Sequence, residues 1–246
     1  MAEGFRPFSH QPPTGFKGAL KFYGRMPLDL QFLTIYRHAK KLLPSFAGEV
    51  LDVGCGQSPY RFLLNSSTTK YTGIDIVEAG NFDYHNPDIV PFNGKDIPFE
   101  AEKFNGLICT EVLEHVAHYQ LLINEMHRVM KKGGTAFVTI PWSARYHYMP
   151  HDYFRYTPSS LKTMFSGFSE VEIIPRGSDI PNIGNKVIVL WFRNLLPQAW
   201  WRWLFVPLWI LTSPILVLTI LAVHLALWFN WGSDDDPLGY TVIAKK

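Results

Sequence analysis

Two aspartates stand near a glycine turn early in the sequence, each at the end of an apolar run. The first run, EVLDVGCG, contains Asp52 and breaks at Gly54 and Gly56. Glycine at such a turn lets the backbone approach a ligand closely. The second run, YTGIDI, contains Asp75 about twenty residues further on, where an acid can accept hydrogen bonds from both hydroxyls of a ribose. The spacing predicts a site for a ligand with an adenosine end.

The same turn argues against two other nucleotide sites. A dinucleotide fingerprint needs a third glycine in the pattern G-x-G-x-x-G, but Pro59 occupies that position. The phosphate-binding pattern that ends in Gly-Lys-Ser/Thr is not found either. A pyrophosphate ligand is therefore disfavoured, and with it a nicotinamide oxidoreductase.

A second group of reactive side chains follows in the segments TEVLEHV and PHDYFRYT. An oxygen atom that accepts a transferred group must lose its proton, and histidine is the usual base. We expect His151 to be that base, with Asp152 as its orienting partner and His115 as the alternative. Two structural interpretations remain open. His115 could only line the ligand pocket, and Asp152 could pair with Arg155 to shape a loop.

A metal site is not expected from this region. Glu114, His115 and His118 lie close together in the sequence, but His-x-x-His departs from the spacing of zinc peptidases. No third ligand is indicated by the pattern. The sequence therefore predicts no bound metal.

Strand-like apolar runs alternate with helical patterns through most of the chain. Residues 28–43 have helical spacing up to Pro44, and AHYQLLINEMHRVMKKGG has it up to Gly133. This alternation predicts an α/β fold with a parallel, doubly wound sheet. Residues 1–27 are expected to form a flexible N-terminal arm. Strands are expected at residues 50–53, 71–76, 107–110, 135–140, 171–175 and 240–244.

Four motifs, EVLDVGCG, YTGIDI, KDIPFEAEKFNGLICTEVLEHV and MKKGGTAFVTIPW, resemble in their order the class I S-adenosylmethionine-dependent methyltransferases of type 11. The resemblance implies a Rossmann-like, seven-stranded sheet and S-adenosyl-L-methionine as the cofactor. It also implies a methyltransferase domain over residues 28–182 and 233–246. The cofactor-binding residues that it implies are Asp52, Gly54, Gly56, Asp75, Ile76, Asp96, Ile97 and Glu111.

The segment PHDYFRYT resembles one in methyltransferases of polysaccharide and lipid-glycan biosynthesis. That resemblance places His151 and Asp152 over the cofactor pocket. It implies that Tyr153, Arg155 and Tyr156 bind the acceptor substrate.

Residues 183–232 are expected to form a hydrophobic helical insert before the last strand. Seven of the eight tryptophans lie between Trp191 and Trp231, and from Leu204 to Trp231 only His224 can carry a charge. The longest proline-free apolar run would reach about 25 Å as a helix, short of the roughly 30 Å hydrocarbon core of a bilayer. A re-entrant hairpin or helices lying in the membrane interface are therefore expected. A buried helical subdomain or an oligomer interface is the alternative.

Composition narrows the function further. The net charge of +2 comes from 23 basic and 21 acidic residues without a long basic run, which argues against bulk nucleic-acid binding. Two cysteines and no apolar leader favour the cytoplasmic face of a membrane over secretion. We expect methyl transfer to a lipid-linked or amphiphilic acceptor, at a hydroxyl of a glycan precursor. A quinone or prenyl-lipid methyltransferase and a non-catalytic, cofactor-binding membrane scaffold are the alternatives, and the oligomeric state is left open.

Overall fold

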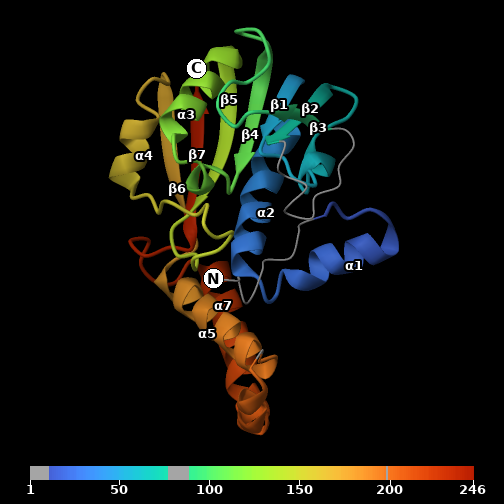
Figure 1. The fold of residues 1–246 in the computed structure, drawn as a ribbon, viewed down its shortest axis with the longest axis vertical. Coiled ribbons are helices and arrows are strands. Elements are labelled where there is room, and N and C mark those ends of the chain that lie inside the picture. The colour runs from blue at the N-terminus through green and yellow to red at the C-terminus, as the bar shows by residue number, and fades with distance from the viewer. Residues whose placement is uncertain (1–10, 77–88, 198) are drawn as a thin grey trace.

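The centre of the chain is a seven-stranded mixed sheet in this computed structural model, which describes residues 11–76, 89–197 and 199–246 (Figure 1). The strand order is β3-β2-β1-β4-β5-β7-β6. Only β7 runs antiparallel, between β5 and β6. The prediction of a Rossmann-like, doubly wound sheet is confirmed. The strands are β1 (Gly48–Val53), β2 (Thr69–Ile76), β3 (Ile89–Phe92), β4 (Phe104–Thr110), β5 (Met130–Pro141), β6 (Glu170–Arg176) and β7 (Gly239–Lys245).

The parallel strands end together at one edge of the sheet, which we call the carboxyl edge. β1 pairs with β2 in register from Gly48 opposite Thr69 to Val53 opposite Ile74. Central strands such as β1 are covered on both faces, and the last four residues of β1, Val50 to Val53, are all buried. Ligands of such sheets bind beyond the carboxyl ends of the strands. The carboxyl edge is therefore where the chemistry is expected.

Helices cover both faces of this sheet. α2 (Leu30–Leu42) packs on one face, and its N-terminus is capped by the Asp29 side chain, which accepts a hydrogen bond from Phe32 N–H at 3.0 Å. α3 (Tyr119–Val129) and α4 (Pro158–Met164) cover the other face. The sequence pattern extended α3 to Gly133, but the helix ends at Val129 because Met130 already pairs with Phe104 as the start of β5.

The N-terminal region is more ordered than expected within its described part. Residues 15–25 form helix α1 (Gly15–Arg25), whereas the sequence suggested a flexible arm. The reason is a cluster of aromatic rings: Phe22 is buried and makes edge-to-face contacts with Phe32, Tyr36 and Phe62. The helical period of α1 was obscured by its three glycines. Residues 1–10 of the expected arm lie outside the described residues.

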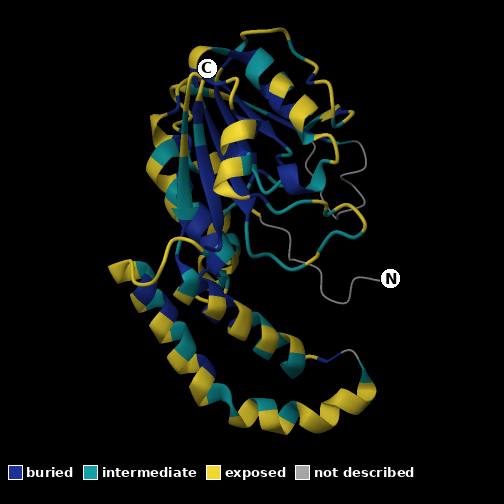
Figure 2. Cartoon of the chain, turned by 90° about the vertical axis from the view of Figure 1, so that its left-hand side faces the viewer, coloured by how far each residue is buried: buried dark blue, intermediate teal, exposed yellow. Residues whose placement is uncertain are grey.

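A helical finger, residues 179–231, leaves the carboxyl edge between β6 and β7 and projects from the body (Figures 1 and 2). It consists of α5 (Asp179–Leu195), a 3-10 turn (Trp200–Phe205), α6 (Val206–Leu211) and α7 (Ser213–Phe229). Within the described residues no single helix has the length and hydropathy of a membrane span. The bent pair Trp200–Leu211 and Ser213–Phe229, with 61° between its members, meets both criteria together.

The base of the finger belongs to the core of the domain. Ile188 and Val223 are buried in the same apolar cluster as residues of α2. Asn185 is buried as well, and its Oδ1 accepts a hydrogen bond from Leu30 N–H at 3.4 Å. Gly184 allows α5 and α7 to pack closely, since a Cβ there would lie 2.0 Å from a methyl carbon of Val223. The predicted insert therefore cannot be removed as a whole without disturbing the core, because the parts of α5 and α7 at its base are packed into that core.

Candidate active site

The glycine turn and Asp75 form one hydrogen-bonded unit at the carboxyl edge. Gly54 and Gly56 have φ angles of 67° and 49°, in the left-handed region that favours glycine. Gly56 N–H donates to Asp75 Oδ2 at 2.8 Å, and Ile76 N–H donates to Oδ1 at the same distance. The space beside Gly54 is not left for a ligand, because a Cβ there would lie 2.5 Å from a methyl carbon of Val112.

Asp52 and Asp75 are buried carboxyls with room for further donors. Burial raises the pKa of Asp75, and the two N–H bonds lower it. Burial raises the pKa of Asp52 to about 7, while a hydrogen bond from the Tyr71 hydroxyl, at 2.7 Å from Asp52 Oδ2, opposes that rise. Oδ1 of Asp52 has no partner among the described residues. A buried oxygen without a donor costs about 1–3 kcal/mol, so a ligand that donates to it is favoured.

Glu111 stands at the end of β4 and is held by a buried arginine that the sequence did not reveal. Its φ of 54° is left-handed, and its Oε1 accepts a hydrogen bond from Arg176 Nη2 at 2.9 Å. The guanidinium lies close to the backbone of Gly239, whose missing side chain leaves the space for it. The only sequence signal for Arg176 is a charged residue at the end of an apolar strand.

Asp96 and Ile97 follow β3, beside the end of β2. Asp96 is exposed, and its Oδ2 accepts a hydrogen bond from Asn93 Nδ2 at 2.8 Å. The Ile97 side chain is buried in the core, and its N–H donates to Glu125 Oε2 at 2.9 Å. Ile97 N–H is therefore already used, whereas the Asp96 carboxylate is exposed.

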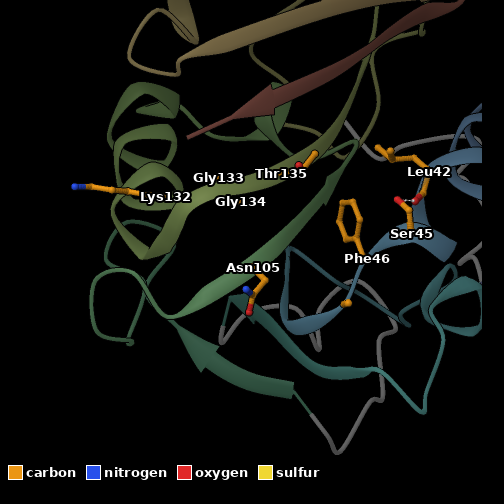
Figure 3. A pocket seen from close by; sticks show the side chains of 9 residues that line it. Leu42, Ser45, Phe46, Asn105, Lys132, Gly133, Gly134 and Thr135 are labelled. Atoms are coloured by element: carbon orange, nitrogen blue, oxygen red, sulfur yellow. Dashed lines mark hydrogen bonds between the residues drawn. The ribbon is translucent and has the colours of Figure 1, made fainter.

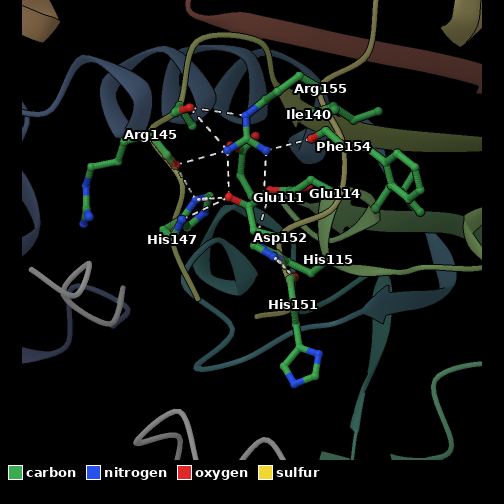
Figure 4. Close-up of polar contacts among 12 residues, drawn as sticks. Glu111, Glu114, His115, Ile140, Arg145, His147, His151, Asp152, Phe154 and Arg155 are labelled. Carbon is green, nitrogen blue, oxygen red and sulfur yellow. Dashed lines mark hydrogen bonds and ion pairs between the residues drawn. The ribbon is translucent and has the colours of Figure 1, made fainter. Parts of the chain in front are cut away.

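The segment after β5 surrounds Asp152, and it confirms the alternative that Asp152 pairs with Arg155 (Figure 4). The Arg155 guanidinium donates to both Asp152 oxygens, at 2.6 and 2.8 Å. His147 N–H donates to Oδ2 at 3.0 Å, and His147 Nδ1 lies 3.1 Å from it. These donors keep the pKa of Asp152 below its usual value, against the effect of burial. The expected pairing of Asp152 with His151 is therefore wrong, because Arg155 and His147 use the carboxylate.

The two histidines proposed as bases have different surroundings. His151 is exposed, and its Nδ1 lies 3.1 Å from the Tyr153 hydroxyl. His115 Nδ1 lies 2.7 Å from the backbone oxygen of His151, and its ring packs edge-to-face on His147. Burial, and then the charge of His147, lower the pKa of His115 to about 4.

The expected acceptor-binding residues also divide into exposed and buried ones. Tyr153 is 45% exposed, so its ring is available to a substrate. Tyr156 is buried, and its hydroxyl donates to the backbone oxygen of Leu113 at 3.0 Å, so the expectation that it binds the acceptor is wrong. Arg155 is engaged by Asp152 and by backbone oxygens of Ala144 and Arg145. Tyr156 and Arg155 fix the shape of the segment instead.

A cavity of about 270 Å³ lies elsewhere, at the amino ends of the strands (Figure 3). Phe46, Asn105 and Thr135 line it, together with Gly133 and Gly134. These residues lie at the beginnings of strands, whereas the glycine turn and the carboxylates lie at their ends. The cavity is therefore unrelated to the candidate site.

The residues at the carboxyl edge fit S-adenosylmethionine. This molecule carries a cationic amino-acid part and a ribose, and Asp52 and Asp75 offer an unpartnered oxygen and a buried acceptor at the glycine turn. At the same edge of the sheet, the segment after β5 supplies the His151 imidazole and the Tyr153 hydroxyl for an acceptor. The arrangement can hold a cationic adenosine ligand next to a second, polar ligand.

Comparisons with known proteins point to the same chemistry. Residues 51–138 match the family described as methyltransferase domain. The chain is 30% identical over 103 residues to the mitochondrial ubiquinone biosynthesis O-methyltransferase of Mus musculus, covering 37% of this chain and 28% of that protein. It is 28% identical over 97 residues to the demethylmenaquinone methyltransferase of Listeria welshimeri, covering 35% and 41%. The chain thus spans less than half of these curated relatives.

The fold is shared with solved structures at low sequence identity. A SAM-dependent methyltransferase from Archaeoglobus fulgidus superposes with a TM-score of 0.55 at 16% identity, over 92% of this chain and 99% of that one. At this identity the match describes the architecture alone, which is the seven-stranded sheet described above.

Proposed function

We infer that this chain, which carries a methyltransferase domain, is an S-adenosylmethionine-dependent methyltransferase that acts on a lipid-borne acceptor at a membrane surface. One observation carries the inference: the glycine turn and the helical finger both lie at the carboxyl edge. A site beside a membrane-associating element receives its acceptor from the membrane. The two cysteines are free, which supports placement at the cytoplasmic face.

The protein contributes alignment and exclusion of water rather than activation of the donor. S-adenosylmethionine, when bound, supplies an electrophilic methyl group. Asp75 would accept from its ribose hydroxyls, Asp52 would bind its cationic amino group, and Asp96 would face the adenine. The Glu111 carboxylate is oriented toward the same edge by Arg176. Alignment of two bound reactants is itself a large part of the rate enhancement that enzymes reach.

The acceptor side offers one exposed base. His151 can take the proton of an acceptor hydroxyl, because its ring is exposed beside Tyr153. Asp152 acts through Arg155 and His147 and is a positioning residue. This supports an oxygen acceptor, and we propose a hydroxyl of a lipid-linked glycan precursor.

The outer surface of the finger supports membrane association. α7 is apolar around its whole circumference, yet only Leu216, Val223 and Ala226 of its residues are buried. A helix that is apolar all round is normally covered by protein or lipid. The outer part of the finger exposes Leu204 and Leu211 at 78% and 76%, and the 3-10 turn that contains Leu204 also exposes the indoles of Trp200, Trp201 and Trp203. Indoles favour the level of the lipid headgroups, so the finger fits a re-entrant or in-plane position.

A quinone precursor is the second candidate acceptor, favoured by the comparisons. The curated relatives include a ubiquinone biosynthesis O-methyltransferase and a demethylmenaquinone methyltransferase. A prenylated aromatic hydroxyl would reach the carboxyl edge from the membrane by the same route. The glycan and the quinone differ in polarity, which makes the two candidates separable.

The central test is incubation of the purified protein with radiolabelled S-adenosylmethionine and extracted membrane lipids. Label in a lipid with a sugar headgroup supports the glycan candidate, and label in a prenylated aromatic supports the quinone. Cofactor binding without any labelled lipid would overturn the proposed activity and favour the scaffold alternative. Absence of cofactor binding would overturn the whole proposal.

Membrane association is tested separately by sedimentation with vesicles of a zwitterionic and an anionic phospholipid. We expect the intact chain to sediment and the double variant Leu204→Glu, Leu211→Glu to remain in the supernatant. Both side chains are exposed, so folding is retained. Leu121→Glu, an exposed leucine on α3, is the matched control. The finger is an oligomer interface instead if the intact chain does not bind vesicles but forms a concentration-dependent dimer, and if the double variant is monomeric.

A further inference from the structure

A buried carboxylate and two imidazoles meet at the carboxyl edge, from two different segments of the chain (Figure 4). Glu114 and His115 come from the turn after β4, and His147 comes from the segment after β5. One ligand atom of each lies within 4.8 Å of those of the other two. His118, which the sequence suggested as a neighbour, is not part of this group.

Glu114 is the unusual member of the group. Its side chain is completely buried, and neither carboxylate oxygen has a hydrogen-bond partner among the described residues. Its nearest cationic candidate is His115, whose Nε2 lies 3.6 Å from Oε1, which is too far for a hydrogen bond. Buried carboxylates are normally hydrogen-bonded, paired or bound to a metal. Glu114 therefore lacks the partner that its position requires.

Both histidines are held at Nδ1 by a backbone carbonyl, which leaves Nε2 as the free ring nitrogen. His115 Nδ1 lies 2.7 Å from the His151 backbone oxygen, and His147 Nδ1 lies 2.8 Å from that of Arg145. A carbonyl oxygen only accepts, so each Nδ1 carries the hydrogen and each Nε2 keeps its lone pair. Histidine ligands of metals almost always donate their other N–H to a carbonyl or carboxylate in this way. His147 has a second such partner in Asp152.

The distances suit one small cation. Two ligands that each lie about 2.1 Å from a tetrahedral ion are about 3.4 Å apart, close to the 3.6 Å between Glu114 Oε1 and His115 Nε2. The ligand nitrogen of His147 lies within 4.8 Å of the other two ligand atoms. A shift of at most about 1.4 Å therefore brings it to the separation of about 3.4 Å that a tetrahedral ion requires. Two imidazoles with one carboxylate favour Zn²⁺ and similar transition metals over Mg²⁺ and Ca²⁺, which prefer oxygen ligands.

We propose that Glu114, His115 and His147 bind a divalent transition-metal ion, with Zn²⁺ as its model, and that Asp152 orients His147 for this purpose. Three protein ligands leave the fourth position of a tetrahedral ion open. His151, whose backbone oxygen holds His115 Nδ1, and Tyr153 belong to the segment where the acceptor is proposed to bind. The proposal concerns the binding of the metal and does not depend on methyl transfer.

The test is calorimetric titration of Zn²⁺ into the full-length protein after removal of metals with a chelator and without cofactor. We expect one Zn²⁺ per chain, and at least a hundredfold weaker binding by His147→Ala and Glu114→Gln. Asp152→Asn should weaken binding by about 10–100-fold, the usual effect of losing the partner of a ligand. His118→Ala is the matched control, an exposed histidine three positions after His115, and it should bind like the parent.

Thermal unfolding of the same samples provides a second measurement. Zn²⁺ should raise the melting temperature of the parent and of His118→Ala, but not of His147→Ala, because only the first two bind it in the folded state. An intact protein that binds no Zn²⁺ would overturn the proposal, as would equal affinity in parent and His147→Ala. S-adenosylmethionine titrated into the same preparations separates the two proposals, since either ligand can bind when the other does not.

Discussion

Removal of the Asp75 carboxylate should abolish most cofactor affinity while leaving the domain folded. In the free protein, Asp75 accepts from Gly56 N–H and Ile76 N–H at 2.8 Å, yet burial still raises its pKa. The carboxylate is thus less well solvated in the free protein than in water. Asp75→Ala relieves that burial cost, and this offsets part of the loss of the two backbone bonds. We expect the free energy of unfolding to fall by only about 1–2 kcal/mol.

Binding is affected much more strongly, because the ribose hydroxyls donate to a charged acceptor. A hydrogen bond to a charged group contributes about 1.5–3 kcal/mol, so two of them contribute about 3–6 kcal/mol. With about 1.4 kcal/mol for each factor of ten, the affinity should fall by roughly 10²–10⁴-fold. The backbone of Gly56 loses its anchor as well, which adds to the loss rather than reducing it.

Calorimetry with S-adenosylhomocysteine, which lacks the reactive methyl group, measures this loss without turnover. Chemical denaturation of the Asp75→Ala protein measures the change in its free energy of unfolding. Glu170→Ala is the matched control, since Glu170 is an exposed acid at the start of β6, where it pairs with Lys245. A folded Asp75→Ala protein that binds within about threefold of the parent would remove Asp75 from the site and refute the assignment of the glycine turn to the adenosine end.

Three further outcomes are expected. His151→Ala should lower turnover at least tenfold with unchanged cofactor affinity, because its ring lies on the acceptor side; a parallel loss of cofactor affinity in calorimetry would contradict this role. Burial lowers the pKa of His38 to about 4, so the imidazole is neutral in the folded state at neutral pH. The free energy of unfolding is therefore highest above the unfolded-state pKa of about 6.5, and it decreases by on the order of 2–3 kcal/mol as the pH falls toward 4. Urea denaturation at both ends of this range should show a smaller decrease for His38→Gln, and an identical decrease would disprove the linkage. Gly184→Ala should destabilise the protein by about 1–3 kcal/mol, because the new methyl group overlaps Val223. Gly24→Ala is its control in thermal melts, because a methyl group there would meet nothing within 4 Å. Equal melting temperatures for Gly184→Ala and the parent would mean that α5 and α7 can move apart without cost to the domain.

The sheet and its glycine turn could be predicted because their signals are local. Apolar runs of strand length, a turn that requires left-handed backbone at Gly54 and Gly56, and an acid at the end of the next run can each be identified within a few residues. Parallel pairing then brings the carboxyl ends of the strands to one edge of the sheet, regardless of the conformation of the connecting loops. β3 was missed because its four residues, IVPF, include a proline and form too short a pattern.

The sequence by itself therefore determined the fold class, the glycine turn with the acid that follows it, and the apolar character of the finger. Only the tertiary structure decided which side chain meets which. Asp152 precedes Tyr153 and follows His151, but its partners are His147 and Arg155, because the segment after β5 folds back on itself without a periodic pattern. Arg176 reaches Glu111 from 65 residues away. The Arg155 pair of Asp152 was one of the alternatives that the sequence left open. The pairs of Asp152 with His147 and of Glu111 with Arg176 depend on how whole segments pack, and the residues next to either partner do not indicate the other.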